Sequence, residues 1–417
     1  MKKVWIIIVA ALAGSVSFAQ SKKLTLTNRL AQQRPDERIV LTRDQVNSKV
    51  KLSAEKPYCI ITTESGVPKV IQFDDLDGDG NWDEAAFLGT FEPKQKQVFL
   101  ISASKSPATV KAVVRAHVRH RHKNADNTFA DAVDTDTMPY NNQPTDFSKQ
   151  KLPPYLTEGP AWENDKVGFR KYFDVRNAND IWGKTTAKMV LEEVGADPSV
   201  SYHHFNPAWG MDILRVGKAL GAGALALQMP VNGKDSVFRF GTNVKQTTYK
   251  KLADGPVRAI FRISYQSWQV AGQSVDVTEE ISIWGGQYFF ENKVTLQNAP
   301  AGARLITGTI DFYETGFHPV KTKGITGLYT FGIQSENHDK LGLAILAPAK
   351  QVIHTAPLNA GGIANTFGVW LNPQKQKAVY RFYSCWEKTD PVFSNETAFT
   401  ALLQQQSDAW NNPIRIK

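Results

Sequence analysis

The sequence predicts a mostly β protein, in which a small β-sandwich is followed by a large one and a short helix lies near the C-terminus. Short runs rich in Val, Ile, Thr, Phe and Tyr recur between polar, Pro or Gly breaks, which is typical of strands and turns. Between residues 256 and 268, apolar and polar side chains alternate with the period of two of a half-buried strand. The one persuasive helical pattern, 396–410, has Asn395 as its N-cap and an apolar face.

Residues 1–19 have the layout of a cleavable secretory signal. Lys2 and Lys3 precede an apolar run over 4–13, and Ser17-Phe18-Ala19 follows it. The run is too short for a transmembrane helix, and no later segment reaches the ~18 apolar residues that a span requires. We therefore expect a secreted or periplasmic protein without a membrane span, beginning near Gln20.

The charge of the chain favours acidic partners. The full sequence carries 49 Lys and Arg against 40 Asp and Glu, a formal charge of +9. Without Lys2 and Lys3 the count is 47 against 40, so the exported chain has a charge of +7. Acidic glycans are more available than nucleic acid outside the cytoplasm, so we expect an acidic oligosaccharide or polysaccharide as the partner.

The two cysteines, Cys59 and Cys385, leave two interpretations open. An oxidising compartment permits one disulfide between them. Both lie in apolar strand-like runs, PYCIITT and YRFYSCW, so two separate buried thiols explain them equally well. Neither interpretation makes the chain a small scaffold that depends on disulfides.

About 400 exported residues are too many for one small core and indicate two domains. Residues 20–123 are predicted to form an N-terminal β-sandwich, because five strand-like runs fall there: KLTLT, RIVLT, YCIITT, KVIQF and QVFLIS. Residues 124–157 are rich in Asp, Asn, Thr and Pro and are predicted to be a linker or long loop. The strand-rich remainder, 158–417, is the larger domain and is expected to contain the active site.

An acidic stretch in the first domain is similar to the start of a calcium loop. Asp75, Asp77 and Asp79 match the opening D-x-D-x-D-G, whose oxygens converge on a hard cation. Ala86 stands where an EF-hand has its bidentate Glu, and Asp83 or Glu84 is a nearby substitute. A structural calcium ion and a hydrated acidic turn both fit this pattern, and no cofactor is expected for the function itself.

The segment 111–123, KAVVRAHVRHRHK, concentrates basic residues. If it is extended, the period of two places one set of them on a single face. The members of this set are Arg115, His117, Arg119, Arg121 and Lys123. Such a strip suits a carboxylated or sulfated sugar chain, although a charged edge strand protected from aggregation explains it as well. No zinc-binding spacing is present, so these histidines are not expected to be metal ligands.

Two tracts carry the residues expected to do chemistry. The first, 158–184, reads EGPAWENDKVGFRKYFDVRNANDIWGK and is predicted to be a polar loop that leads into a strand. The second, 201–218, reads SYHHFNPAWGMDILRVGK and places twin histidines before a proline turn. The GAGALAL run that follows lacks both the G-x-x-x-x-G-K-[ST] and the G-x-G-x-x-G patterns, which disfavours a nucleotide site.

Three blocks, in order, are similar to those of an exported bacterial family, domain of unknown function 4861. They are DDLDGDGNWDEAAFL, EGPAWENDKVGFRKYFDVRNANDIWGK and YHHFNPAWGMDILRVGKALGAGALAL, and the resemblance extends over most of the exported chain. It implies a β-supersandwich of the galactose-mutarotase type and a role in polysaccharide utilisation. It also implies elimination of water or a glycoside from uronate sugars, but it assigns no catalytic residue.

Elimination beside a uronate carboxylate, by a lyase or dehydratase, requires three groups. A base takes the C5 proton, a cation or donor neutralises the developing enolate, and an acid protonates the leaving oxygen. We expect His203 or His204 as the base, because an imidazole titrates near neutral pH. Tyr172 or Tyr202 is expected to be the acid, and the planar fork of Arg170 is expected to bind the carboxylate.

Other side chains are expected to hold the substrate. The predicted binding residues are Trp162, Glu163, Lys171, Trp209, Asp212 and His318. The two tryptophans would stack on sugar faces unless they belong to the core. His318 with Glu314 is a reserve acid–base pair. Neighbours in a strand point to opposite faces, so at most one of the twin histidines is expected in one pocket.

Three alternative functions stay open. A glycoside hydrolase would use two carboxylates, whose separation decides between retention and inversion. The available carboxylates are Glu158, Glu163, Asp165 and Asp212. A sugar epimerase or mutarotase would use a histidine with a glutamate. A non-catalytic glycan-binding protein would use aromatic and basic side chains without proton transfer.

Overall fold

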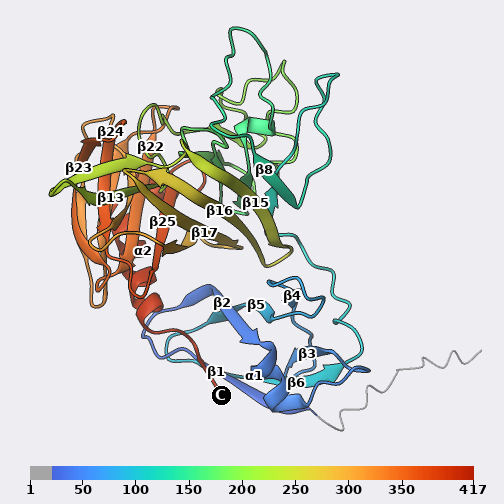
Figure 1. Cartoon of the computed structure of the whole chain (residues 1–417). Coiled ribbons are helices and arrows are strands. Elements are labelled where there is room, and N and C mark those ends of the chain that lie inside the picture. The colour runs from blue at the N-terminus through green and yellow to red at the C-terminus, as the bar shows by residue number, and fades with distance from the viewer. Residues whose placement is uncertain (1–20) are drawn as a thin grey trace, which may run out of the picture.

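The computed structural model describes residues 21–417 and consists mainly of antiparallel β-sheets (Figure 1). The predicted signal, 1–19, lies outside the described residues. The mostly β class and the late helix are confirmed: α2 (Glu396–Asn411) begins after Asn395, whose side chain accepts a hydrogen bond from the backbone of Thr397. The short polar helix α1 (Arg43–Val50) was not predicted. Within 21–417, no helix has the length and apolar character needed to cross a membrane.

A small unit of two sheets contains the first strands of the chain. One sheet has the order β26-β1-β6-β3 and the other the order β2-β5-β4. The strands are β1 (Lys22–Thr27), β2 (Arg34–Thr42), β3 (Tyr58–Thr63), β4 (Gln72–Asp74), β5 (Glu84–Phe91), β6 (Lys96–Ser104) and β26 (Arg415–Ile416). Leu26, Ile39, Ile61 and Phe87 meet in the core between the sheets. All five predicted runs overlap strands, whereas β5 was missed.

A large unit contains three further sheets. The largest has nine strands in the order β20-β21-β22-β25-β18-β17-β16-β15-β8. These strands are β8 (Thr135–Met138), β15 (Val244–Asp254), β16 (Arg258–Val270), β17 (Gln273–Trp284), β18 (Phe289–Gln297), β20 (His318–Lys321), β21 (Ile325–Ile333), β22 (Lys340–Pro348) and β25 (Lys377–Trp386). The predicted alternation in β16 is confirmed, since Ala259, Phe261 and Ile263 are buried in the main core.

Two five-stranded sheets pack against the nine-stranded sheet through the main core. One has the order β14-β13-β19-β24-β23, and the other, called here the site sheet, has the order β12-β11-β10-β9-β7. The strands of the first are β13 (Leu225–Val231), β14 (Lys234–Arg239), β19 (Arg304–Ile310), β23 (Val352–Ala360) and β24 (Ile363–Leu371). Those of the site sheet are β7 (Ala116–Arg119), β9 (Ala161–Asn164), β10 (Val167–Lys171), β11 (Asn179–Lys184) and β12 (Gly210–Asp212). Phe169, Phe290 and Leu305 show that all three sheets share this core.

The two units are joined by a buried ion pair and by the end of the chain. Arg258 of β16 lies 2.6 Å from Asp74 and 2.7 Å from Glu84, and the amide of Gln72 bonds to the backbone beside it. After α2, the chain returns to the small unit, where β26 pairs with β1 (Figure 1). Because β7 pairs with β9, the change from small to large unit falls between β6 and β7, ahead of residue 123.

The two cysteines lie in different hydrophobic clusters. Cys59 is buried in the core of the small unit, and Cys385 is buried beside α2. Both thiols are free, which agrees with the interpretation as separate buried residues. Burial raises the pKa of Cys59 to about 12 and that of Cys385 well above its usual value.

We expect both thiols to be unreactive in the native protein, because the thiolate is the reactive form and burial suppresses it. A thiol-reactive dye should label no cysteine in native buffer and two per chain in guanidinium chloride without reductant. The Cys59→Ser variant should show one labelled thiol after denaturation. A denatured wild-type chain without free thiols would instead establish a disulfide.

Candidate active site

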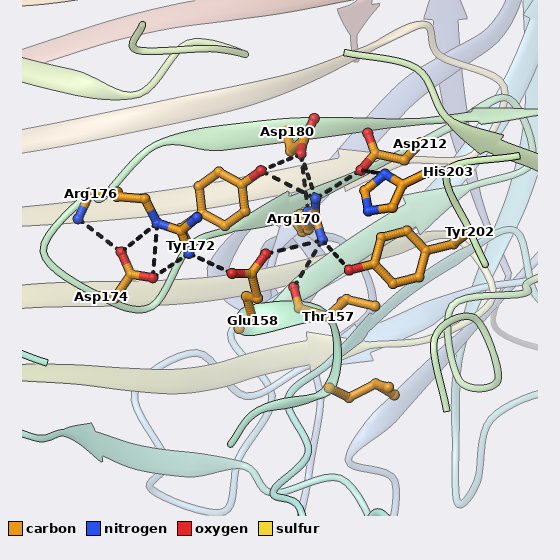
Figure 2. A network of polar contacts seen from close by, with 12 residues as sticks. Thr157, Glu158, Arg170, Tyr172, Asp174, Arg176, Asp180, Tyr202, His203 and Asp212 are labelled. Carbon is orange, nitrogen blue, oxygen red and sulfur yellow. Dashed lines mark hydrogen bonds and ion pairs between the residues drawn. The ribbon is translucent and has the colours of Figure 1, made fainter. Parts of the chain in front are cut away.

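The two predicted tracts meet on the site sheet at Arg170. In the antiparallel register Arg170 lies opposite Asp180, and Trp182 lies opposite Asp212, so one arginine and two aspartates share one face. Nη2 of Arg170 is 2.7 Å from Oδ2 of Asp180 and 2.8 Å from Oδ2 of Asp212 (Figure 2). All three side chains are at least nine-tenths buried. Tracts separated along the sequence are therefore joined through one guanidinium group.

Two phenols complete the surroundings of Arg170. Tyr172 donates a hydrogen bond of 2.6 Å to Asp180, and Nη1 of Arg170 donates one of 3.3 Å to the Tyr202 oxygen. The guanidinium carbon also lies 4.9 Å and 5.4 Å from the centroids of these two rings. We call Arg170, Asp180, Asp212 and the two tyrosines the Arg170 network. Its geometry is rigid because every member has at least one charged partner.

A strained turn brings a third carboxylate to the network. Thr157 and Glu158 have φ of 50° and 68°, a left-handed conformation that costs energy in residues other than glycine. Gly159 follows with φ of 155°, where an added Cβ would lie 2.2 Å from a backbone oxygen. The turn places Glu158 2.6 Å from Arg176 and 3.6 Å from Arg170. Strain of this kind is often retained at functional sites.

Burial sets the protonation of the network. Burial and the nearby Asp180 raise the pKa of Asp212 well above its usual value, while Arg170 opposes the shift. The neutral acid form of Asp212 is therefore favoured relative to that of a solvent-exposed aspartate. Burial also raises the pKa of Tyr202, with Arg170 again opposing, so its phenol stays protonated. Clustered pKa shifts of this kind are more common at functional sites than elsewhere.

His203 lies at the exposed edge of the network. Its Nδ1 is 3.4 Å from Oδ2 of Asp212, and 63% of its side chain is exposed. Burial and the charge of Arg170 lower its pKa. The twin histidines were expected in a strand, but residues 201–209 form turns and loop. Of the pair, only His203 has a recorded contact with the network, while His204 is exposed.

Comparison with known proteins adds the family. A family model described as "Domain of unknown function (DUF4861)" matches residues 26–416, which is nearly the whole chain. The chain belongs to this family. A relative in Formosa agariphila, "Uncharacterized protein P7", is 23% identical over 294 residues, which cover 65% of this chain and 70% of the relative.

Solved structures from Enterococcus faecalis align with this DUF4861 protein at low identity. An alpha-mannosidase has a TM-score of 0.48 at 10% identity, and a protein of glycosyl hydrolase family 38 has a TM-score of 0.47 at 9% identity. Both alignments cover 96% of this chain, but only 46% and 47% of the solved chains. The DUF4861 chain thus spans about half the length of these proteins.

Three residues predicted to bind substrate are buried structural residues instead. Trp162 packs in the main core with Phe169 at 5.7 Å between ring centroids, so it has no face free for a sugar. Glu163 is bound to Lys184 and is fully buried. Lys171 lies 3.1 Å from Glu279 with both side chains inaccessible. The predicted substrate contacts of Trp162, Glu163 and Lys171 are therefore corrected: these side chains hold the sheets together.

A cavity of about 570 Å³ opens beside the network. Tyr202 and Trp209 both line it, and Trp209 packs on Trp182 with 6.0 Å between ring centroids. Lys188 supplies an exposed amine, while Glu192, Glu193 and Asp197 supply carboxylates. Trp209 is thus the predicted aromatic residue that does have access to a cavity.

His318, the reserve base, lies in a different sheet. It stands on β20 at the edge of the nine-stranded sheet and stacks on Tyr329, with ring centroids 5.0 Å apart. Glu314, its expected partner, lies in the preceding loop and has a φ of 52°. The described contacts of His318 do not include any member of the Arg170 network.

The predicted basic strip is not available to a ligand. Only Ala116–Arg119 of segment 111–123 forms a strand, and most basic side chains of the segment have partners within the fold. Arg115 binds both Asp36 and Asp165 at 2.7 Å, and Arg119 is buried among backbone oxygens. His117 lies 2.8 Å from Glu192 and 3.0 Å from Asp254. Burial alone would lower the pKa of His117, but these two carboxylates raise it to about 9. The strip stabilises the fold and does not form a surface for sugars.

The acidic loop of the small unit brings Asp75, Asp77 and Asp83 together, with one oxygen of each within 4.8 Å of the others. Asp75 accepts backbone hydrogen bonds from Gly78 and Gly80. These bonds, and chiefly the one from Gly78, lower the pKa of the Asp75 carboxyl group. Asp79 bonds instead to Asn81. This geometry suits both a hydrated turn and a structural calcium ion, so the calcium site stays a prediction.

One member of the network was not singled out from the sequence. Asp180 lies within the tract 158–184, but nothing in the motif distinguishes it from the other acids there. The pairing of β10 with β11 would have identified it. Once these strands form a hairpin, Asp180 lies directly opposite Arg170. Register, which sequence patterns specify poorly, was the missing information.

We expect Arg170→Gln to destabilise the protein by about 3–5 kcal/mol, because it leaves the buried Asp180 carboxylate without its cation. Arg262→Gln is the matched control, since its ion pair with Glu280 is partly exposed and should contribute about 0–1 kcal/mol. Urea unfolding measures both. Equal, small losses in the two variants would contradict the assignment of Arg170 as the centre of the network.

Proposed function

We propose that this protein is an enzyme that acts on acidic, uronate-containing oligosaccharides or polysaccharides by β-elimination at the Arg170 network. The observation that carries the proposal is the contact between His203 and Asp212. It joins an exposed imidazole to a buried carboxyl group whose pKa is raised. Tyr202, whose ring contacts that of His203, lines the neighbouring cavity, so a dyad of this kind can move protons to and from a sugar bound there.

His203 is the proposed base. In the tautomer of neutral His203 that has its proton on Nδ1, facing Asp212, Nε2 carries a free electron pair. The C5–H bond of the uronate then breaks, its proton passes to Nε2, and its electron pair forms the C4–C5 double bond as the C4–O bond breaks. The resulting imidazolium faces Oδ2 of Asp212 through Nδ1, and the ionised form of this carboxyl group stabilises it.

Tyr202 is the proposed acid. Its raised pKa keeps the phenol protonated, its ring lies 4.4 Å from that of His203 between centroids, and it lines the cavity. It donates its proton to the departing oxygen, and the phenolate that remains is stabilised by the hydrogen bond from Arg170. Arg170 is too deeply buried to touch a sugar, so it is a positioning residue, as is Tyr172, which holds Asp180.

The cavity beside Tyr202 supports a sugar ligand. Trp209 offers an apolar ring on which a pyranose can stack, and Lys188 is a cation that can pair with a uronate carboxylate. The positive charge of the whole chain adds long-range attraction for an acidic glycan. Hydrolysis by two carboxylates is supported less well. Asp180 and Asp212 are buried and both bind Nη2 of Arg170, which leaves no room for a sugar between their carboxyl groups.

We expect His203→Ala to reduce turnover at least ~100-fold, the usual contribution of a general base, while His204→Ala, the matched exposed control, keeps near wild-type turnover. Uronate-containing oligosaccharides are the probes, and ultraviolet absorbance detects the conjugated product of elimination. New reducing ends without absorbance would replace elimination by hydrolysis. Binding without any product, or full activity of His203→Ala, would refute the proposed mechanism.

The pH dependence provides a separate test. The base works only when neutral, so kcat/KM should be lost as pH falls through the pKa of His203, which lies below its ordinary 6.5. The acid works only when protonated, so activity should fall again only above the ordinary tyrosine value of 10.0, since the pKa of Tyr202 is raised. A profile of kcat/KM against pH should be flat through neutrality. An acid limb with its midpoint above 7 would be incompatible with His203 as the base.

A further inference from the structure

A second cluster of chemically capable side chains lies beyond β7. His120 and His122 follow this strand, and Asp136 stands on β8, the edge strand of the nine-stranded sheet. Nε2 of His120 is 2.7 Å from Oδ2 of Asp136, and Nε2 of His122 is 3.0 Å from the same oxygen. Two imidazoles thus converge on one carboxylate oxygen, although no zinc-binding spacing is visible in the sequence.

The spacing of these three donor atoms suits a small divalent ion. In a tetrahedral zinc site with bonds of about 2.0–2.1 Å, neighbouring donor atoms are about 3.3 Å apart. The observed separations from the Asp136 oxygen, 2.7 Å and 3.0 Å, are shorter than this by about 0.6 Å and 0.3 Å, and all three donors lie within 4.8 Å of one another. Small side-chain rotations would therefore admit an ion without any change of backbone.

The cluster is rigid on one side and open on the other. His120 is fully buried, with the rings of Tyr155, Phe173 and Tyr249 4.9, 5.0 and 5.1 Å from its own between centroids. His122, by contrast, has 43% of its side chain exposed. A fixed ligand and a ligand at the surface together leave a coordination position that solvent or a small anion can reach.

We propose that His120, His122 and Asp136 bind a divalent transition-metal ion, with Zn²⁺ the best fit. Two neutral imidazoles and one carboxylate form a donor set that zinc prefers over calcium or magnesium, which bind mainly oxygen. Three protein ligands with one open position are typical of sites where the ion contacts water or substrate, and structural zinc sites usually have four protein ligands.

The site would also brace the Arg170 network. Tyr155, which packs on His120, precedes the strained Thr157–Glu158 turn, and Phe173, which packs on both His120 and Tyr155, follows Tyr172. An ion that fixes His120 therefore stabilises both segments that feed the network. The site nevertheless stands independently of the proposed elimination chemistry, because none of its three ligands belongs to the network.

Zinc binding by the full chain, freed of any affinity tag and dialysed against EDTA, tests the proposal. Calorimetric titration with ZnCl₂ and metal analysis after gel filtration should give one ion per chain, and zinc should raise the melting temperature. His122→Ala, which changes a partly exposed side chain, and Asp136→Asn should each weaken binding at least ~100-fold, more than the loss of an outer-shell partner.

Two matched controls separate this site from other donors. His354→Ala removes an exposed histidine of β23 that stacks on Trp370, and Asp75→Asn disrupts the acidic loop; both should bind one zinc ion as the wild type does. Calcium in excess should not displace zinc. Absence of binding by the wild type, or unchanged affinity in His122→Ala and Asp136→Asn, would overturn the proposal. These measurements do not depend on turnover, so they are decided separately from the proposed enzyme function.

Discussion

The site of this protein depends on the burial of one positive charge. A guanidinium group that is almost fully removed from water keeps its charge only if anions and hydrogen-bond acceptors surround it. Arg170 obtains them from three segments, which supply Asp180, Asp212 and Glu158. A slip of one residue between β10 and β11 would turn these side chains to the apolar face, so the charge also specifies the register of the site sheet. The geometry of the candidate site and the geometry of the sheet are thus set by the same interaction.

The same requirement explains why charged residues were poor guides to the site. Lys171, Lys184, Arg115 and Arg258 all have buried or partly buried acidic partners. Each partner comes from a different segment of the chain, and a single sequence does not show which acid meets which base. The basic segment 111–123, for which a ligand surface was one of two interpretations, contains internal ion pairs. His203 and Asp212 lie in one predicted tract, so their contact depends less on the pairing of distant segments.

The fold was easier to predict than the site because strands have local signals. The alternation of apolar and polar residues over 256–268 indicates which side chains of the strand are buried, and Asn395 indicates where the helix begins. The missed elements lack such signals: β5 reads EAAFLGTF, with small residues in place of β-branched ones, and α1 has Val46 as its one buried residue. His120 and Asp136 illustrate the remaining limit, because the packing of two different sheets, and not sequence spacing, brings them together.

The pairing of β26 with β1 affects how the molecule can assemble. Nearly the whole chain separates these two strands, so the first sheet acquires its edge only after the large unit and α2 have been placed. Contacts so distant along the sequence slow folding, because a long loop must close before they contribute. Until then, the backbone groups of β1 face solvent on one side and can template pairing with another molecule. A fragment that ends before α2, and therefore lacks β26, would carry that open edge permanently, so the fold of the small unit depends on the end of the chain.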